Sequence, residues 1–342
     1  MTIAAAYSAA NPQPSVYIFG DSISDTGRLK KITLGIVPPE PYWNGRFSSG
    51  PVWTEYFSLL QGTQLRNYAV GAAVTATSKL KLFGFLPLTI PSTKDQINQY
   101  IIDNPNTPPG FFDIAVLEIG GNDIMTVLPD VVENKVNIEE FAESLSNAVI
   151  SQCQLLKTAG FKTIFVTNAP PMQYVPLMAM ENRASIAGAI SKSYNAKLAS
   201  KLPSWGSQRN IRVGLLDFDT FVTNALSSDV SRTLGIMDTS SSCIGGNSLN
   251  LFTSRNHAEA LIRFLVDIKG TLLCSNPSTN FFWDPIHPGE RVHRLFGFYA
   301  SEFANSLRAS NYSSLFLPTQ ANLKALISAH QLGQMAPKPA RI

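Results

Sequence analysis

The sequence lacks a long hydrophobic run. No apolar stretch approaches 20 residues, the length a helix needs to cross a bilayer, so we expect no transmembrane segment. It also lacks a long basic run: 27 Lys and Arg stand against 24 Asp and Glu, a balance that argues against nucleic acid as a partner. The opening residues, MTIAAAYSAA, carry no charged region of the kind that begins a signal peptide. We therefore expect residues 1–14 to be a flexible N-terminus.

Cysteine is scarce, with three residues and no C-x-x-C pair. This spacing argues against zinc and thiol-redox motifs, and we expect neither a metal nor a cofactor. Cys153 lies in an apolar helical pattern, whereas Cys243 and Cys274 bracket a segment rich in Ser, Gly and Asn. Two interpretations stay open. All three could be reduced thiols, or Cys243 and Cys274 could form a disulfide, which would indicate an oxidising compartment.

No internal repeat or linker divides the chain, so we expect one domain over residues 15–334 and a loose tail over 335–342. Short apolar runs that fit buried strands alternate with helix-length patterns. The expected strands are 16–19, 65–70, 114–119, 163–167 and 211–218. The expected helices are 96–102, 138–159, 184–202 (ended by Pro203) and 290 to about 307. This alternation predicts a parallel sheet covered on both faces, with ligands at the carboxyl ends of its strands.

Polar clusters fall at those strand ends. The stretch FGDSISDTG, residues 19–27, follows the first predicted strand and crowds two serines and two aspartates beside two glycines. A serine needs a base to accept its proton, and the base needs a partner that fixes its tautomer. Among the four histidines, only His287 has a carboxylate at short range in a stiffened loop, Asp284. We therefore predict a catalytic triad of Ser22, Asp284 and His287.

A triad also needs hydrogen-bond donors for the oxyanion of the tetrahedral intermediate. The Ser22 backbone N–H, the Gly71 N–H and the Asn122 side-chain amide follow three different strands, and we predict that they converge. Each cluster alone could be an ordinary turn or helix cap. Their order and their places at strand ends favour a catalytic site.

Five segments then resemble the GDSL, or SGNH, hydrolase family. They are FGDSISDTG (19–27), GRFSSGPVW (45–53), NYAVGAA (67–73), EIGGNDI (118–124) and DPIHPGERVH (284–293). The resemblance implies an α/β fold of the flavodoxin-like kind, a three-layer α/β/α sandwich with a central parallel sheet. It implies the same triad and oxyanion donors, and it adds Asp21 and Asp25 as residues that support the nucleophile turn. Gly289 departs from the family pattern, in which a threonine is common, and this concerns the stiffness of the loop.

The segment GRFSSGPVW and the general layout are similar to the branch of bacterial phospholipases and glycerophospholipid:cholesterol acyltransferases, a layout that plant GDSL lipases share. We therefore expect a lysophospholipase or phospholipase A, with phospholipid or lysophospholipid as substrate, peripheral contact with lipid surfaces and a sterol as a further acyl acceptor. An esterase of acetylated carbohydrates and an inactive binding protein are the alternatives, since a fold does not name a substrate.

Two insertions bear on the substrate. Residues 79–92 are densely apolar, and residues 237–283 carry the two outer cysteines and end in aromatic residues. Both could be walls for an acyl chain or ordinary core. We name Phe83, Phe85, Phe282 and Trp283 as candidate substrate contacts. A Cys243–Cys274 bridge could clamp the second insertion as a lid beside the site, and it would indicate a secreted or otherwise extracytoplasmic protein.

Overall fold

The computed structural model describes residues 13–76, 78–82, 86–244, 273–309 and 315–334. Its main sheet has five strands in the order β2-β1-β5-β6-β7, and every neighbouring pair is parallel. The strands are β1 (Ser15–Phe19), β2 (Gln64–Asn67), β5 (Ile114–Leu117), β6 (Thr163–Thr167) and β7 (Arg212–Leu216). The strand order reverses between β1 and β5. In open parallel sheets this switch point, outside the carboxyl ends, is where ligands bind.

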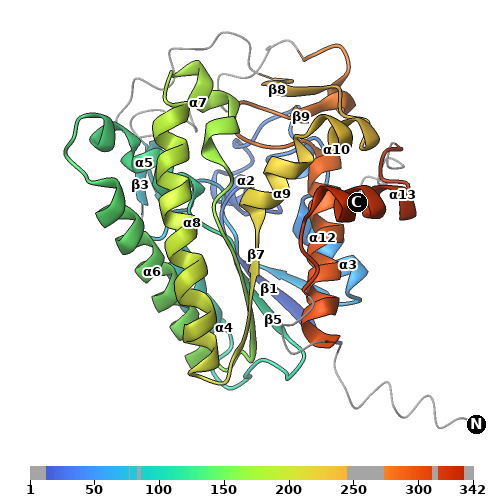
Figure 1. Ribbon diagram of the computed structural model, residues 1–342. Helices are drawn as coiled ribbons and strands as arrows, with labels where there is room; N and C mark the ends of the chain where they lie inside the picture. The colour runs from blue at the N-terminus through green and yellow to red at the C-terminus, as the bar shows by residue number, and fades with distance from the viewer. Residues whose placement is uncertain (1–12, 77, 83–85, 245–272, 310–314, 335–342) are drawn as a thin grey trace, which may run out of the picture.

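Helices cover both faces of the sheet, as Figure 1 shows. One face packs against α4 (Thr93–Asp103), α5 (Gly121–Val132), α6 (Ile138–Thr158) and α8 (Ala184–Ser207). The other packs against α3 (Trp53–Leu60), α9 (Phe218–Ala225), α10 (Ser228–Thr233), α12 (Glu290–Ala309) and α13 (Gln320–Ala329). Along β1, Val16 and Ile18 enter the second core while Phe19 enters the first, because successive side chains of a strand point to opposite faces. The predicted three-layer α/β/α sandwich is confirmed.

Three predicted strands are too long. Strand β5 ends at Leu117, two residues before its predicted end, and side chains end β2 and β7 early. The Asn67 side-chain oxygen accepts the N–H of Ala69 at 2.8 Å, which turns the chain after β2. The Asp217 carboxylate accepts the N–H of Thr220 at 3.0 Å and caps α9. Phe218 is therefore the first residue of a helix rather than the last residue of β7.

The prediction that Pro203 ends its helix is wrong. Helix α8 continues to Ser207 with Pro203 inside it. Proline removes one backbone hydrogen bond of the helix, but the turn beyond it is held by packing. Trp205 is buried, and an added Cβ at Gly206 would lie only 2.4 Å from the Val213 side chain, so this turn sits directly on β7.

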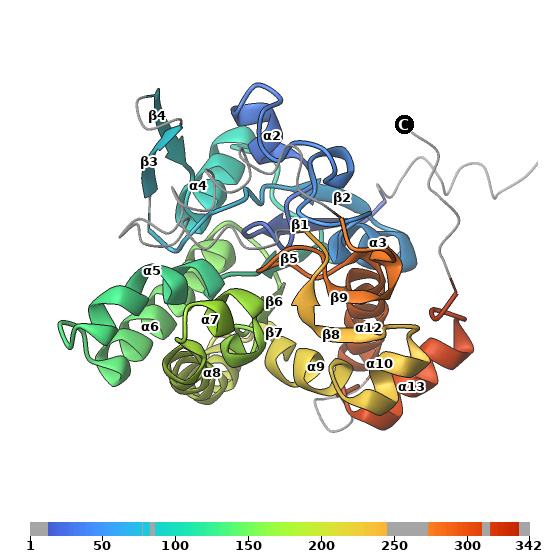
Figure 2. The same ribbon diagram turned by 90° about the horizontal axis from the view of Figure 1, so that it is seen from above.

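The two insertions contribute two small sheets apart from the main one, and Figure 2 shows β3 and β4 well separated from β8 and β9. Strands β3 (Ser78–Leu82) and β4 (Leu86–Ile90) pair antiparallel as a hairpin. Strands β8 (Asp238–Ser242) and β9 (Asn280–Phe282) pair parallel and mark the two ends of the second insertion. The remaining short helices are α2 (Arg28–Ile32), α7 (Pro176–Met180) and the 3₁₀ turns Trp43–Gly45, Met172–Tyr174 and Pro277–Thr279.

Candidate active site

The structure brings Ser22, His287 and Asp284 into one hydrogen-bonded line. His287 Nε2 lies 2.7 Å from Ser22 Oγ, and His287 Nδ1 lies 2.6 Å from Asp284 Oδ2. All three side chains are buried, with the two loop residues fully inaccessible to solvent. Ser22 follows β1, at the strand-order reversal, while the other two lie in the loop before α12. The line has the geometry in which a histidine can take the proton of a serine hydroxyl.

Backbone hydrogen bonds fix the loop that carries the histidine. The Asp284 Oδ1 atom accepts the N–H of Ile286 at 2.7 Å and the N–H of His287 at 2.8 Å. The Trp283 N–H donates to the His287 carbonyl at 2.7 Å, which closes the loop at its base. The loop thus holds the imidazole by both its ring and its backbone.

Tyr42 is a fourth member of this site that the sequence analysis missed. Its buried hydroxyl donates to Asp284 Oδ2 at 2.6 Å. Burial raises the pKa of Asp284, but the neighbouring His287 and the hydrogen bonds it accepts, including that of Tyr42, lower the pKa below the usual 3.8. Asp284 therefore stays ionised and keeps Nδ1 of the histidine protonated. A tyrosine 242 positions away in the sequence gives no local signal of this contact.

Asp25 ties the start of α2 to the end of β2. Its Oδ1 atom accepts the N–H groups of Gly27 at 2.7 Å and Arg28 at 2.6 Å. Its Oδ2 atom accepts those of Leu29 at 3.0 Å and Gly71 at 2.7 Å. One buried carboxylate thus joins the nucleophile turn to the neighbouring strand end.

This contact corrects the prediction for Gly71. A backbone N–H that donates to Asp25 is not available to an oxyanion, so Gly71 does not fit the donor role that we assigned to it. Glycine is required there for space, because an added Cβ would lie 2.5 Å from the Phe47 ring. The next residue, Ala72, has a φ of 65°, in the left-handed region that side chains disfavour. Within the described ranges, no group accepts the N–H of Ala72 or of Ser22.

Asn122 lies at the start of α5, across the switch point from Ser22. Its Nδ2 donates to the Ala73 carbonyl at 2.9 Å and to Asp21 Oδ2 at 3.2 Å. Asp21 Oδ1 also accepts the N–H of Ile23 at 3.0 Å, inside the nucleophile turn. The amide of Asn122 is therefore held next to the turn that carries Ser22, and the longer of its two bonds is the one to Asp21.

Beneath the turn lies a second carboxyl group that the sequence analysis did not single out. Glu118 Oε2 accepts the Ser24 hydroxyl at 3.0 Å and the Asp21 N–H at 3.3 Å. Burial raises the pKa of Glu118 to about 7. Burial, and next the charge of Glu118, raises the pKa of Asp21 well above its usual 3.8. Burial thus favours the protonated form of both carboxyl groups, which lie in contact through the Asp21 backbone N–H.

The buried His293 contacts the start of α3. Its Nδ1 accepts the Trp53 N–H at 3.3 Å. Burial, followed by the charge of His287, lowers the pKa of His293 to about 3. It is therefore neutral at physiological pH.

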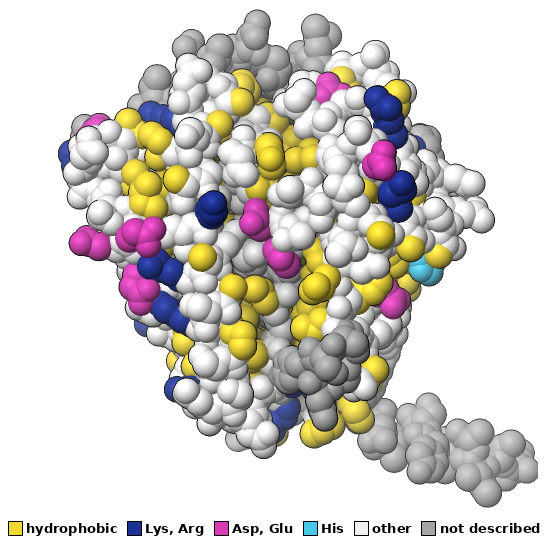
Figure 3. All heavy atoms as spheres, in the orientation of Figure 1, with side chains coloured by type: hydrophobic (Ala, Val, Ile, Leu, Met, Phe, Trp, Pro, Cys, Tyr) yellow, Lys and Arg dark blue, Asp and Glu magenta, His cyan; other side chains and the backbone are white. Residues whose placement is uncertain are grey.

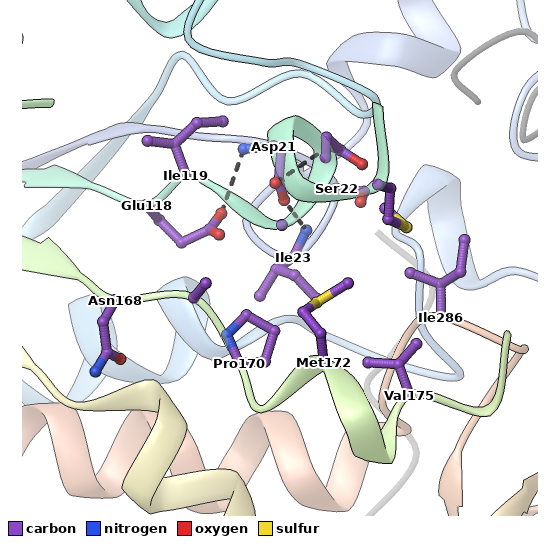
Figure 4. A pocket seen from close by; sticks show the side chains of 14 residues that line it. Asp21, Ser22, Ile23, Glu118, Ile119, Asn168, Pro170, Met172, Val175 and Ile286 are labelled. Carbon is purple, nitrogen blue, oxygen red and sulfur yellow. Dashed lines mark hydrogen bonds between the residues drawn. The ribbon is translucent and has the colours of Figure 1, made fainter. Parts of the chain in front are cut away.

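Ser22 lines a hollow that we call the proximal pocket (Figure 4). Its empty volume is about 440 Å³, counting the part open to solvent. Glu118, Asn122 and Met125 line one side, and Met172 and Val175, from the loop after β6, line another.

The four candidate substrate contacts differ in their positions relative to the pockets. Phe83 and Phe85 lie outside the described residues. Phe282 is buried and faces a second hollow, described below. Trp283 is buried against Tyr42, with ring centroids 6.4 Å apart, and lines neither hollow. We therefore interpret Trp283 as core.

Cys243 and Cys274 form a disulfide, with Cα atoms 4.8 Å apart, and Cys153 is buried and free. The structure thus favours the second of the two interpretations of the cysteines. Most of the chain between the bridged cysteines, residues 245–272, lies outside the described residues, and a lid there stays a prediction. None of the described helices is long and apolar enough to span a bilayer.

The chain was compared with protein families and with known proteins. The family model for the GDSL-like lipase/acylhydrolases matches residues 16–298. The phosphatidylcholine-sterol acyltransferase of Aeromonas hydrophila is 25% identical over 335 residues, which cover 89% of this chain and 95% of the relative. The thermolabile hemolysin of Vibrio parahaemolyticus is 25% identical over 300 residues, which cover 85% of this chain and 64% of the relative.

Among solved structures, a lipolytic G-D-S-L family protein from Veillonella parvula matches with a TM-score of 0.40 and 13% identity. The match covers 83% of this chain and 94% of that one. The predicted family resemblance is confirmed by the family match, which spans every segment from which it was drawn.

Proposed function

Because the chain belongs to the GDSL-like lipase/acylhydrolase family, we propose that it hydrolyses acyl esters of lipids with Ser22 as nucleophile. The observation that carries the proposal is the buried line from Ser22 Oγ to His287 Nε2 and from His287 Nδ1 to Asp284, with bonds of 2.7 and 2.6 Å. The line opens on the proximal pocket.

In the first half-reaction, Ser22 Oγ attacks the ester carbonyl carbon while His287 Nε2 accepts the hydroxyl proton. Asp284 stabilises the imidazolium that forms, because it stays ionised beside Nδ1. The carbonyl oxygen becomes an oxyanion. His287 then gives its proton to the departing alcohol oxygen, the carbon–oxygen bond to that alcohol breaks, and an acyl–Ser22 ester remains.

Three groups suit the oxyanion: the N–H groups of Ser22 and Ala72, and the amide of Asn122. The first two have no acceptor among the described residues. Both N–H groups of the Asn122 amide already donate, so we propose that the amide exchanges its longer bond, the 3.2 Å bond to Asp21, for a bond to the oxyanion. Such preorganised donors act on charge that exists only in the transition state. Ala72 thus takes the place first assigned to Gly71.

In the second half-reaction, His287 takes a proton from an incoming water or alcohol, whose oxygen attacks the acyl carbon and releases Ser22. Water completes hydrolysis and an alcohol completes acyl transfer. The similarity to a phosphatidylcholine-sterol acyltransferase supports a phospholipid or lysophospholipid as acyl donor and a sterol as an alternative acceptor.

A second feature supports action at a lipid surface. At the end of α2 and in the loop after it, three aliphatic side chains are exposed, Ile32 (38%), Leu34 (90%) and Ile36 (36%). Lys30 and Lys31 precede them. The loop is anchored by buried Val37, which belongs to the same core cluster as Trp283 at the base of the catalytic loop. Aliphatic tips beside basic residues favour peripheral contact with anionic bilayers; we call residues 30–36 the aliphatic loop.

The Cys243–Cys274 disulfide supports an extracytoplasmic location, because such bridges persist in oxidising compartments. The measurement is direct. In protein isolated from its native compartment, both thiols should resist alkylation until a reductant is added. Ready alkylation without reductant would contradict the bridge and the location together.

The proposed reaction is tested with a fluorophosphonate probe and a series of esters. The probe should label Ser22 in the intact protein and fail to label Ser22→Ala. Phosphatidylcholine, lysophosphatidylcholine, soluble esters of short and long acids and an acetylated oligosaccharide are then compared, with and without cholesterol. Hydrolysis of the acetylated sugar alone would favour the carbohydrate esterase, and absence of labelling would favour the inactive binding protein.

A further inference from the structure

A second apolar hollow adjoins the proximal pocket. Four residues line both hollows: Ile23, Pro170, Val175 and Ile286. Beyond this common wall, the second hollow is lined by Tyr174, Phe218, Val222, Phe281, Phe282 and two prolines, and we call it the distal pocket. Its empty volume is about 330 Å³, counting the part open to solvent.

The lining of the distal pocket suits hydrocarbon. Phe218, Val222, Phe281 and Phe282 are each at most 6% exposed, and among the residues that the structure describes no charged side chain lines the hollow. The hydroxyl of Tyr174, a half-exposed residue, is the one polar side-chain group that the described part of the chain contributes to this lining. A sugar or a phosphate headgroup would lose its water here without gaining hydrogen-bond partners, which is unfavourable.

Two residues of the common wall are sequence neighbours of Ser22 and His287. Ile23 follows Ser22 in the chain and Ile286 precedes His287. Around the cavity in Figure 4, Ile23, Pro170, Val175 and Ile286 form one border of the space next to Ser22. In the space-filling view, hydrophobic side chains gather between α7 and α9, over the elements that line the distal pocket (Figure 3).

We propose that the distal pocket binds the far carbons of a fatty acyl chain whose first carbons occupy the proximal pocket. This inference rests on the proposed acyl-ester chemistry and names its substrate class as long-chain acyl esters. The acyl chain is favoured over the alcohol partner because it remains bonded to Ser22 through both half-reactions, whereas the departing and incoming alcohols exchange. A chain tethered at Ser22 and continuing past Ile23 reaches the distal pocket without a break in the apolar wall.

Val222 is the position for the test, since it lies on α9 beyond the common wall and lines only the distal pocket. Val222→Phe fills that pocket, and Val222→Ala enlarges it. Val131→Phe is the matched control: Val131 is also on a helix, is similarly buried at 8% exposed and lines neither pocket. For each protein, kcat/KM is measured with p-nitrophenyl butyrate, octanoate, dodecanoate and palmitate.

The readout is the ratio of kcat/KM for palmitate to that for butyrate. Val222→Phe should lower this ratio about tenfold, the effect of keeping roughly two methylene groups in water. Val222→Ala should not lower it, and Val131→Phe should keep the wild-type ratio. If Val222→Phe does not fold, Val222→Ala still decides. A preferred acyl length that moves toward longer chains supports the distal pocket, and an unchanged preferred length contradicts it.

A wild-type ratio in folded Val222→Phe would overturn the distal pocket while leaving ester hydrolysis in place. Equally, if Val222→Phe changes the fraction of acyl groups transferred to cholesterol in vesicles but not the chain-length ratio, the pocket holds the acceptor and the proposal is wrong. Failure of the proposed function looks different, because wild type would then hydrolyse no ester of the series and Ser22 would not react with the fluorophosphonate.

Discussion

Replacing Glu118 with glutamine should make the protein more stable at alkaline pH, relative to wild type. The glutamine in Glu118→Gln keeps a side-chain oxygen that can accept the Ser24 hydroxyl bond now made to Glu118 Oε2, so shape and packing are nearly conserved. What the substitution removes is an acid whose pKa burial has raised to about 7, against 4.5 for the unburied group. The effect therefore depends on pH.

The sign follows from proton binding. Between about pH 4.5 and 7, the unfolded chain has released the Glu118 proton while the folded protein keeps it, so wild-type stability falls as pH rises through this window. Each unit between the two pKa values is worth about 1.4 kcal/mol. The folded protein thus loses about 3 kcal/mol by pH 8, and the raised pKa of Asp21 adds to the loss in the same direction. The substituted glutamine has no proton to lose.

The comparison must be a difference between two proteins, because His293 acts in the opposite direction. With its pKa lowered to about 3, this neutral histidine makes the folded protein less stable as pH falls below 6.5. The His293 contribution is common to wild type and Glu118→Gln, so it cancels in their difference.

Urea unfolding followed by tryptophan fluorescence at pH 5 and pH 8 measures the effect. The stability of Glu118→Gln minus that of wild type should rise by about 2–3 kcal/mol between the two pH values. Glu140→Gln, at an exposed position on α6, serves as control and should show no such rise. An equal difference at both pH values for Glu118→Gln would refute the reasoning, because it would mean that Glu118 is ionised in the folded protein throughout.

Four further predictions concern the site and the surface. Ser22→Ala should fold normally and lower kcat by about 10⁶, as loss of a triad nucleophile does. Asn122→Ala should lower kcat about 10²- to 10³-fold with little change in KM, because its bond to the oxyanion forms only in the transition state. Tyr42→Phe should lower kcat/KM about tenfold and shift the acid limb of the pH–rate profile to higher pH, since Asp284 loses a hydrogen bond worth roughly 1.5–3 kcal/mol. Leu34→Ser should weaken binding to phosphatidylcholine–phosphatidylglycerol vesicles while hydrolysis of a soluble butyrate ester is unchanged.

Each of these has a contrary result. Stoichiometric labelling of Ser22→Ala by a fluorophosphonate would exclude Ser22 as nucleophile. A loss in Asn122→Ala that is confined to KM would indicate ground-state binding instead. An unshifted pH profile in Tyr42→Phe would show that Tyr42 contributes only packing and does not act on Asp284 through its hydroxyl. Equal sedimentation of wild type and Leu34→Ser with the vesicles would exclude the aliphatic loop from lipid contact, and Leu59→Ser, at another exposed leucine, is the matched control.

The hydrogen-bonded line of Ser22, His287 and Asp284 could be predicted from the sequence because the signals for it are local. Asp284 and His287 are three residues apart in a loop, and Ser22 follows a clear apolar strand. The sheet could be predicted for a similar reason, since most of its strands are short apolar runs that stand out in the sequence. The ends of β2 and β7 could not be placed, because they depend on single side-chain hydrogen bonds made by Asn67 and Asp217.

The errors at the site have a common cause. Whether Gly71 or Ala72 presents a free N–H depends on backbone dihedral angles and on a carboxylate, Asp25, that lies 46 positions away. Tyr42 and Glu118 likewise act through contacts with distant parts of the chain. A sequence states which groups exist near a strand end, but the direction in which each N–H points is fixed only when the strands are assembled.

The Cys243–Cys274 disulfide at the base of the second insertion makes the position of His287 independent of the length of that insertion. Cys243 and Cys274 lie 31 positions apart in the chain, yet their Cα atoms are 4.8 Å apart, and the flanking strands β8 and β9 pair directly. The chain leaves and returns at nearly the same point, just before the loop that holds Asp284 and His287. Segments of other lengths or compositions could therefore be grafted between the two cysteines without displacing His287 from Ser22. This makes the bridged pair a natural junction at which the insertion can change while the framework around Ser22 and His287 stays the same.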